Sequence, residues 1–496
     1  MNPVRVDTIV EALRSAGLLS GTQGVLPQAV QCITDDSRGI AAGALFLAVV
    51  GSERDGHEYL DRAASGGAVL AVVDDPSRTS LPSLVVADTR RAAAVASAAF
   101  YGEPARELRL VGVTGTNGKT TTVGMLRHLL DHPDARCASI GTLGVLIGSE
   151  GTPLFGGSGL TTPGPVELQR LLRTLHGLGV RTVAMETSSH ALHQGRLEGL
   201  RFAAAIYTNL TRDHLDYHQT MEAYFAAKAL LISLLDTDGT AIINADDSAW
   251  NALPARPRTV TFGLNGPADV RAANIRYGPR GSGWDLVVDG RAHEHGDAAP
   301  HAITLPLIGD FNIANAIGAA AAAWAMGVSV DEIARHLSTM PQVPGRLEII
   351  HDDPAVLRDY AHTPDALARA LDAVRPFTTG QLIAVFGCGG DRDKGKRPEM
   401  GHIAESHADR VIVTSDNPRT EDPERILDDI EAGMQKSHER IEDRRGAIAR
   451  AIHSAVSGDV VVLAGKGHED YQIRGTVKYP FDERSIVGEI ISEGNT

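Results

Sequence analysis

Short apolar runs alternate with polar, glycine-rich loops along most of the chain, and this pattern predicts an α/β fold. The runs at 44–50, 68–73, 108–113, 182–185, 203–208, 382–386, 411–413 and 460–463 have the length and composition of buried strands. Apolar residues at helical spacing predict helices after residue 118 and over 56–65, 221–235 and 309–326. Residues 260–305, rich in Gly, Asp and Val, predict an antiparallel segment to which the sequence assigns no role.

Two breaks divide the pattern into three parts. The chain has 496 residues, too many for one core. Gly102-Glu103-Pro104 precedes one strand, and Pro341 to Pro344 precede another series of strands. We therefore predict domains at residues 1–106, 107–341 and 342–496.

Composition narrows the partners and the compartment. The formal charge of −15 argues against nucleic acid or an anionic membrane as the main partner. The three cysteines lie far apart without metal-binding spacing, which is typical of a reducing compartment. The start lacks an apolar signal core, and the apolar stretch 313–326 is too short to span a bilayer. We expect a cytoplasmic protein without membrane insertion.

The segment 113–122, Val-Thr-Gly-Thr-Asn-Gly-Lys-Thr-Thr-Thr, carries the strongest chemical signal. It lies between a predicted strand and a predicted helix, where backbone N–H groups wrap phosphates, a lysine adds charge and a hydroxyl reaches Mg²⁺. The usual pattern has a glycine where Val113 stands. A strand–helix turn that merely needs small residues is the alternative, which the context disfavours.

Polar residues follow two further predicted strands. Glu186 follows one, and Asn209 and His214 follow the other. Ligands of open parallel sheets lie beyond the carboxyl ends of the strands, so Glu186 and His214 are candidates for the metal region. The alternatives are a solvated surface acid and a hydrogen-bonded loop histidine. Lys228, among apolar helix residues, is by pattern alone a snorkelling side chain.

In the last third of the chain, four predicted strands each lead into a loop dense in glycine and charge. These loops suggest a second ligand surface that faces the phosphate loop across a cleft. Thr363 and Pro364 predict the start of a helix. Basic residues that could neutralise phosphate or a carboxylate are Arg346, Arg392, Lys394, Lys396 and Arg397. From these features alone we infer an ATP-using, multidomain α/β enzyme whose reaction stays open.

Six segments taken together resemble the Mur ligases of bacterial cell-wall synthesis. They are 112–121, Glu186-Thr-Ser-Ser-His190, 208–216, 309–315, Pro344-Gly-Arg-Leu-Glu348 and Asp359-Tyr-Ala-His-Thr-Pro364, and they span nearly the whole chain in family order. The missing first glycine of the phosphate loop is normal in that family.

The resemblance implies an N-terminal UDP-sugar-binding α/β domain, a central phosphate-loop ATPase domain with a mostly parallel sheet and a C-terminal Rossmann-like domain. The chain looks like the members that add meso-2,6-diaminopimelate to the D-glutamate γ-carboxylate of UDP-N-acetylmuramoyl-L-alanyl-D-glutamate. ATP and Mg²⁺ would drive this ligation through an acyl phosphate, in peptidoglycan precursor synthesis. We expect a cytoplasmic monomer that acts on these small molecules.

The resemblance also implies roles for individual residues. The catalytic residues would be Lys119, Glu186, His214 and Lys228. The metal would be held by Thr120, Glu186, His214 and Lys228, with Lys228 carbamylated to N6-carboxylysine. ATP would meet Gly115, Thr116, Asn117, Gly118, Lys119, Thr120, Thr121, Asn312, Arg346, Asp359 and His362. The UDP-sugar peptide would meet Ser37, Thr161, Thr162, Ser188, Gln194 and Arg196. The diaminopimelate would meet Arg392, Asp416, Asn417, Pro418, Arg419, Gly465 and Glu469.

Three alternatives remain at this point. The L-lysine-adding ligase shares the reaction, but usually carries a different residue where Arg419 stands. A folylpolyglutamate synthetase shares the central and terminal domains but lacks the N-terminal module. A non-catalytic nucleotide-binding scaffold is disfavoured by the intact set of Lys119, Glu186, His214 and Lys228. Residues 51–56 match the outline of a uridine segment without individual contacts.

Overall fold

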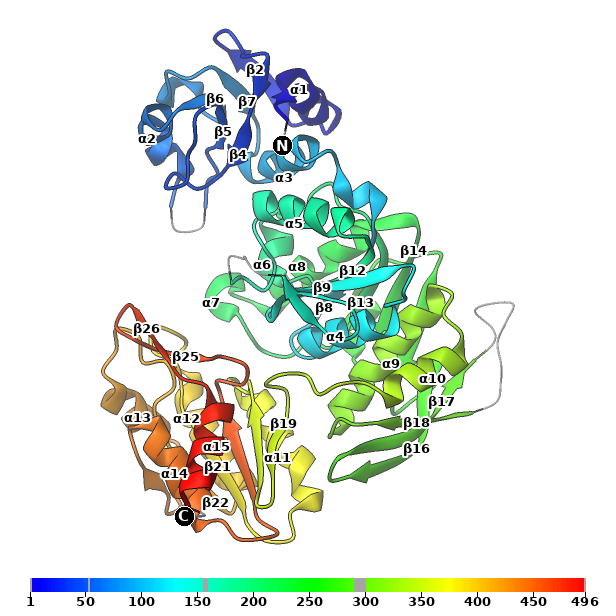
Figure 1. Ribbon diagram of the computed structural model, residues 1–496, viewed down its shortest axis with the longest axis vertical. Helices are drawn as coiled ribbons and strands as arrows, with labels where there is room; N and C mark the ends of the chain where they lie inside the picture. Colours follow the sequence, from blue (N-terminus) through cyan, green and yellow to red (C-terminus); the bar gives the residue numbers. More distant parts are fainter. Residues whose placement is uncertain (1, 52–53, 155–158, 290–299, 495–496) are drawn as a thin grey trace.

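Three open sheets follow one another along the long axis of the molecule (Figure 1). The computed structural model describes residues 2–51, 54–154, 159–289 and 300–494. Over these residues the sheets have 5, 11 and 6 strands. The predicted α/β class and the three-part architecture are confirmed. None of the helices in these ranges is long and apolar enough to cross a membrane.

The first sheet has the strand order β2-β7-β6-β5-β4. Its strands are β2 (Leu19–Gln23), β4 (Cys32–Thr34), β5 (Ala44–Leu47), β6 (Ala68–Val73) and β7 (Ser83–Val86). Alternate residues of β5 and β6 bury opposite faces, with α1 (Val6–Ser15) and α3 (Thr89–Phe100) on one face and α2 (Leu60–Ser65) on the other. A small sheet pairs β1 (Val4–Arg5) with β3 (Ala29–Val30).

One predicted boundary in this part was wrong. The strand expected over 44–50 ends at Leu47, because the chain turns back to form the Val50–Asp55 bridge. The helical segment expected over 56–65 is confirmed, with a 3₁₀ turn, Gly56–Tyr59, before the α-helix that begins at Leu60. Of the uridine segment, Ser52 and Glu53 lie outside the described residues.

The central sheet has the order β11-β10-β9-β12-β8-β13-β14-β15-β16-β17-β18. Its strands are β8 (Arg109–Thr114), β9 (Arg136–Gly141), β10 (Gly144–Ile147), β11 (Thr152–Leu154), β12 (Val180–Glu186), β13 (Phe202–Tyr207), β14 (Leu235–Asn244), β15 (Thr259–Gly263), β16 (Val270–Gly278), β17 (Gly281–Val288) and β18 (His301–Leu305). In the order of the sheet, the neighbouring strands from β9 to β16 pair in parallel. At one edge β9, β10 and β11 pair antiparallel, and at the other edge β16, β17 and β18 do.

Helices cover both faces of this sheet, which explains why the central strands β8, β12 and β13 are buried along nearly their whole length. They are α4 (Lys119–Leu129), α5 (Pro165–Gly177), α6 (Ser189–His193), α7 (Leu215–His218), α8 (Met221–Ser233), α9 (Asp310–Ala325) and α10 (Val330–Ser338). One core contains α4, α9 and α10, and the other contains α5 and α8 (Figure 1). The segment 260–305 is only partly antiparallel as predicted, because β15 joins the parallel strand β14. Residues 290–299 of that segment lie outside the described ranges.

The third sheet has the order β19-β20-β24-β21-β22-β23. Its strands are β19 (Glu348–Asp352), β20 (Ala355–Asp359), β21 (Leu382–Phe386), β22 (Arg410–Val413), β23 (Glu439–Arg440) and β24 (Val460–Ala464), and a hairpin of β25 (Tyr471–Arg474) and β26 (Val477–Pro480) follows. The helices α11 (Pro364–Val374), α12 (Lys396–His407) and α13 (Pro423–Glu431) cover one face, and α14 (Arg444–Ser454) and α15 (Glu483–Gly494) the other. All pairs but β19–β20 are parallel.

The predicted helix start at Thr363 and Pro364 is confirmed. The Thr363 side chain accepts a hydrogen bond from the Ala366 N–H, and Pro364 is the first residue of α11. The boundaries at 106/107 and 341/342 stay predictions.

Candidate active site

A cavity of about 710 Å³ lies between the central sheet and the third sheet. The register of the central strands explains which residues line the cavity on the side of the central sheet. Strands β12 and β13 flank β8, with Glu186 beside Val113 and Tyr207 beside Thr114. The residues that follow these strands therefore meet around the loop after β8. Predicted site residues that line the cavity are Thr116, Asn117, Gly118, Lys119, Thr120, Thr121, Thr161, Glu186, Ser188, His214, Lys228, Arg346, Asp359 and His362.

Two glycines allow the loop between β8 and α4 to fold tightly. Gly118 has φ +85°, and a Cβ there would lie 2.2 Å from Oδ1 of Asn315. A Cβ on Gly115 would lie 1.9 Å from Oγ1 of Thr208. The loop is also held from β13, since Asn117 N donates to Oδ1 of Asn209 at 2.9 Å. The start of α4 is thus fixed in place with the open N–H groups that suit a phosphate.

Two lysines meet at one carbonyl oxygen beneath this loop. Nζ of Lys119 donates to the Gly115 oxygen at 2.9 Å, and Nζ of Lys228 donates to the same oxygen at 2.7 Å. Lys228 is 1% exposed and its Nζ lies 4.4 Å from the ring centre of Tyr224. Its snorkelling interpretation was wrong. Burial, with the nearby charge of Lys119, holds the pKa of Lys228 well below the usual value.

Glu186 is buried, which excludes the alternative of a solvated surface acid. Its Oε1 accepts from the Thr142 N–H at 2.8 Å, and its Oε2 accepts from the Thr142 hydroxyl at 3.2 Å. A Cβ on Gly141 would lie 2.3 Å from Oε1, which explains the glycine there. The carboxylate is therefore held in one orientation at the cavity wall.

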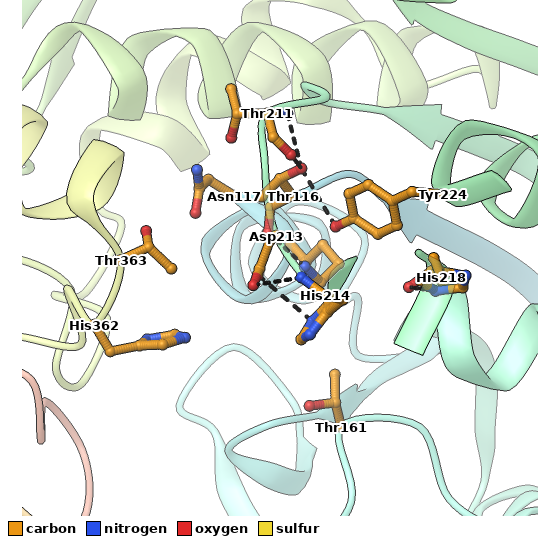
Figure 2. A network of polar contacts seen from close by, with 12 residues as sticks. Thr116, Asn117, Thr161, Thr211, Asp213, His214, His218, Tyr224, His362 and Thr363 are labelled. Carbon is orange, nitrogen blue, oxygen red and sulfur yellow. Dashed lines mark hydrogen bonds and ion pairs between the residues drawn. The ribbon is translucent and has the colours of Figure 1, made fainter. Parts of the chain in front are cut away.

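His214 lies beside an acid that the sequence analysis did not single out. Its Nε2 is 3.5 Å from Oδ2 of Asp213, and its backbone N–H donates to Oδ1 of Asp213 at 2.8 Å. Figure 2 shows this pair facing the cavity, with His362 pointing toward it from the third sheet. Burial opposes ionisation of Asp213, but His214, His362 and Lys119 lower its pKa overall. The Thr-Arg-Asp-His sequence after β13 was the available signal.

The third sheet contributes Arg346 and Asp359 to the same cavity. Nη2 of Arg346 donates to Oγ1 of Thr120 at 3.0 Å. Oδ2 of Asp359 accepts from the Leu347 N–H at 2.6 Å, while burial raises the pKa of Asp359 to about 6 despite the nearby Arg346. A direct bridge also joins the two parts, since Nδ2 of Asn117 donates to Oδ2 of Asp365 at 3.0 Å.

Two of the residues predicted for ATP lie behind the cavity wall. Gly115 shapes the loop from beneath, as described above. Asn312 is buried in the first turn of α9, where its Nδ2 donates to the Ile308 oxygen at 2.7 Å. Its Oδ1 takes no hydrogen bond from the described residues.

The residues predicted for the UDP-sugar peptide form a chain of hydrogen bonds that leads to Glu186. Oγ1 of Thr162 donates to the backbone oxygen of Glu186 at 2.8 Å. The backbone oxygen of Thr162 in turn accepts from Nη1 of Arg196 at 2.9 Å. Arg196 also bonds Oε1 of Gln194, and Ser188 N donates to Oγ1 of Thr162. The hydroxyl of Thr161 lies 3.1 Å from that of Thr142.

Ser37 lies on the first sheet, in the turn after β4. That turn is closed by Asp36, whose carboxylate accepts from the Arg38 N–H at 2.9 Å. Burial raises the pKa of the preceding residue, Asp35, while the nearby positive charge of Arg196 partly lowers it. The turn thus borders the Thr162–Arg196 region.

The residues predicted for diaminopimelate do not line this cavity, and they gather instead at the ends of β21, β22 and β24. Nδ2 of Asn417 donates to Oε2 of Glu469 at 2.8 Å, and Nη1 of Arg419 donates to the Gly390 oxygen at 2.8 Å. Arg419 has φ +51°, a conformation that costs energy for a residue with a side chain.

Glycines bring the three loops close together. A Cβ on Gly389 would lie 2.9 Å from Nη1 of Arg419 and 3.8 Å from Cγ of Arg392, and one on Gly390 would lie 1.9 Å from the Pro418 oxygen. A Cβ on Gly465 would lie 2.6 Å from Oδ2 of Asp416.

Part of the basic run has a structural role instead of the predicted one. Arg397 is fully buried and pairs with Glu421 at 2.9 Å and with Asp429 at 2.8 Å. Lys394 also pairs with Glu421, at 3.1 Å. These two cations hold their loop against α13 and are not free to neutralise a ligand.

The fold and the cavity define a multidomain nucleotide-binding α/β protein. Sequence comparison narrows the class. Residues 29–111 match the model of the Mur ligase family catalytic domain, 113–323 that of the Mur ligase middle domain, and 345–467 that of the Mur ligase glutamate ligase domain. The chain is 44% identical over 495 residues to the UDP-N-acetylmuramoyl-L-alanyl-D-glutamate--2,6-diaminopimelate ligase of Synechococcus elongatus, covering 95% of this chain and 97% of the relative.

Solved structures agree. A UDP-N-acetylmuramoyl-L-alanyl-D-glutamate--2,6-diaminopimelate ligase superposes with a TM-score of 0.66 at 36% identity, covering 95% of this chain and 96% of that one. Folylpolyglutamate synthase of Mycobacterium tuberculosis shares the fold. It superposes with a TM-score of 0.61 at 19% identity, covering 75% of this chain and 92% of that one. The chain belongs to the Mur ligase family and is an ATP-dependent ligase. The predicted family and enzyme class are confirmed.

Proposed function

We propose that the protein joins meso-diaminopimelate to the D-glutamate γ-carboxylate of UDP-N-acetylmuramoyl-L-alanyl-D-glutamate, with ATP as the energy source. The observation that carries this proposal is the cavity where the cations Lys119 and Arg346 converge beside Glu186. Such a concentration of cations suits a triphosphate and a carboxylate together. The 44% identical relative from Synechococcus elongatus is a ligase of this kind.

The reaction has two steps. The γ-carboxylate attacks the γ-phosphorus of ATP, which forms an acyl phosphate and releases ADP. The amine then attacks the acyl carbon, and the tetrahedral intermediate expels phosphate to leave the amide. In the first step Lys119 and Arg346 balance charge on the transferred phosphoryl group, while Asp359 and His362 hold the nucleotide and the buried Asn312 supports the cavity wall behind it.

Mg²⁺ fits the central wall of the cavity. Within the described residues no group of three or more His, Cys, Asp or Glu side chains is arranged to hold a metal. Magnesium, however, commonly binds through one or two protein ligands plus phosphates and water. Glu186 and the Thr120 hydroxyl would serve it, with His214 nearby, and the ion would neutralise phosphate charge.

Lys228 suits the carbamate role better than a conventional cation. Its low pKa favours the neutral amine, which is the form that reacts with CO₂. The resulting N6-carboxylysine would replace this neutral amine beside Lys119 with an anion that supports Mg²⁺. Lys119 and the carbamate would then carry opposite charges, which favours the charged form of both.

The two remaining substrates would bind in different parts of the molecule, the diaminopimelate beyond the residues that line the cavity. The UDP-sugar peptide would meet Ser37 on the first sheet and the Thr162–Arg196 hydrogen bonds, ending near Glu186. The diaminopimelate would lie at the carboxyl ends of β21, β22 and β24, with Arg392, Pro418 and Gly465 around it. There Arg419 would bind the distal carboxylate, which L-lysine lacks. We place the domain boundaries at 106/107 and 341/342 and the enzyme in the cytoplasm, where ATP and nucleotide-linked precursors occur.

The choice of amine provides the test. ADP release in the presence of ATP and UDP-N-acetylmuramoyl-L-alanyl-D-glutamate should depend on meso-diaminopimelate and respond far less to L-lysine. Arg419→Ala should lower kcat/KM for meso-diaminopimelate. The loss of transition-state binding free energy should be about 2 kcal/mol, as for the loss of a charged hydrogen bond. Arg425→Ala, which removes an exposed arginine from the neighbouring helix α13, is the matched control.

Three outcomes would contradict the proposal. A wild-type preference for L-lysine would favour the lysine-adding ligase. ATP turnover that requires a folate would favour a folylpolyglutamate synthetase. Unchanged biological function of Lys119→Ala would favour a non-catalytic scaffold.

A further inference from the structure

Lys466 is a fully buried lysine that the proposed reaction does not use. Its side chain is 0% exposed, and it follows Gly465 in the loop after β24. Its Nζ lies 3.1 Å from Oδ1 of Asn417 and 3.0 Å from Oε2 of Glu469. A buried ammonium costs free energy unless its donors are used, so these contacts explain how the charge is tolerated.

The same contacts fix the orientation of Glu469. Nδ2 of Asn417 also donates to Oε2 of Glu469, at 2.8 Å, so the three side chains close a triangle. Two donors therefore hold Oε2. Among the described residues none donates a hydrogen bond to the other oxygen, Oε1, which leaves it for a ligand.

The neighbouring loop is held from behind in a similar way. The Ile473 N–H of β25 donates to Oδ1 of Asn417 at 2.9 Å, the same oxygen that accepts from Lys466. Asp416 is 8% exposed, and its Oδ2 has no hydrogen-bond partner within the described part of the chain. A buried carboxylate oxygen without a partner is rare and costly, and this one lies against Gly465, where a Cβ would be 2.6 Å from it.

We propose that Lys466 is the positioning residue of the amine site. Its buried ammonium locks Asn417 against Glu469, so that the free Oε1 of Glu469 accepts from the ammonium of a zwitterionic amino-acid group. Arg419 supplies the opposite charge for the carboxylate of that group. This inference rests on the proposed function, because it takes the loops after β22 and β24 to bind the amine.

The test removes the charge and keeps the length of the side chain. In Lys466→Met the KM for meso-diaminopimelate should rise at least tenfold, while the KM values for ATP and for the UDP-linked dipeptide stay within about twofold. Lys466→Gln, which keeps a hydrogen-bond donor, should show a smaller rise and guards against a variant that fails to fold. Lys478→Met is the matched control, since Lys478 is exposed and contacts the ring of Tyr471, the ring that Lys466 also approaches.

The outcomes separate the two proposals. An unchanged KM for meso-diaminopimelate in both Lys466 variants, or equal losses for all three substrates, would overturn the role of Lys466 while leaving the proposed function intact. A wild-type protein that makes no product with meso-diaminopimelate would overturn the proposed function, and the role of Lys466 with it. Thermal melting of each variant shows whether the fold is kept.

Discussion

At the scale of single residues, the lysines of the cavity differ more in environment than their sequence suggests. Lys119 and Lys228 share the Gly115 carbonyl oxygen, but only Lys228 is packed beneath an aromatic ring and nearly free of solvent. Two cations so close to one another disfavour each other's charge. The structure thus gives a physical reason for an amine at Lys228 that is neutral and reactive.

A first prediction concerns this amine. Lys228→Ala should reduce kcat by roughly 100-fold or more, about 3 kcal/mol in the barrier, because the site loses the anion that supports the metal. Bicarbonate should not restore activity to this variant, whereas wild-type protein depleted of CO₂ should regain activity when bicarbonate is added. Mass spectrometry of the native wild type should detect a carboxylated lysine. Near-normal turnover of Lys228→Ala would refute the carbamate role.

At the scale of elements, buried ion pairs attach the loops to the sheets that carry them. Arg397 in α12 holds Glu421 and Asp429, and Arg444 in α14 pairs with Glu483 in α15 with both side chains 0% exposed. Arg444 also donates to the Ala464 oxygen at the end of β24, at 2.9 Å. Helices on both faces of the third sheet therefore position the loops of the proposed amine site.

A second prediction follows for Arg397 and Glu421. Arg397→Met should lower the free energy of unfolding by about 3 kcal/mol, because it leaves two acids without their buried partner. Arg445→Met, which breaks the exposed pair with Glu489, should cost less than about 1 kcal/mol. Urea unfolding at neutral pH measures both.

The pH dependence of stability gives an independent check of this pair. The Arg397 guanidinium lowers the pKa of Glu421 from 4.5 to about 2. Its contribution is therefore fully present above pH 4.5 and is lost as the pH falls toward about 2. The stability difference between wild type and Arg397→Met should shrink over that range, and a constant difference would contradict the assignment.

At the scale of the whole molecule, the cavity depends on contacts between sheets. Arg346 reaches Thr120, and Asn117 reaches Asp365, so two hydrogen bonds join the phosphate loop to the third sheet. Each part also has its own apolar core. Separate cores with polar contacts between them are typical of domains that move relative to one another.

A third prediction concerns assembly. The exposed large apolar residues among the described positions are scattered over all three parts, for example Val25, Tyr277 and Tyr479, and form no single apolar face. Light scattering should therefore give a mass near 52.5 kDa, the mass of one chain, independent of concentration. A concentration-dependent dimer would contradict this expectation.

Several features of the site could be predicted from local sequence. The phosphate loop, the helix start at Pro364 and the strand β21 depend on glycine, proline and short apolar runs, which act within a few residues. Polar residues at strand ends likewise indicated Glu186 and His214. The roles of Asp213 and Thr142 could not be predicted this way, because they depend on partners such as Lys119 and Glu186 that are distant in sequence.

The sequence by itself determined the α/β class, the family and the residues with the chemistry to bind phosphate, because those depend on local pattern and on the identity of side chains. Only the tertiary structure decided which of them are buried and paired. It showed that Lys228, interpreted from its pattern as a snorkelling side chain, is buried in the cavity wall, and that Arg397 pairs with Glu421. It also placed Lys466 between Asn417 and Glu469. Burial and pairing set the charge state and orientation of an ionisable group, and both are properties of its surroundings in three dimensions.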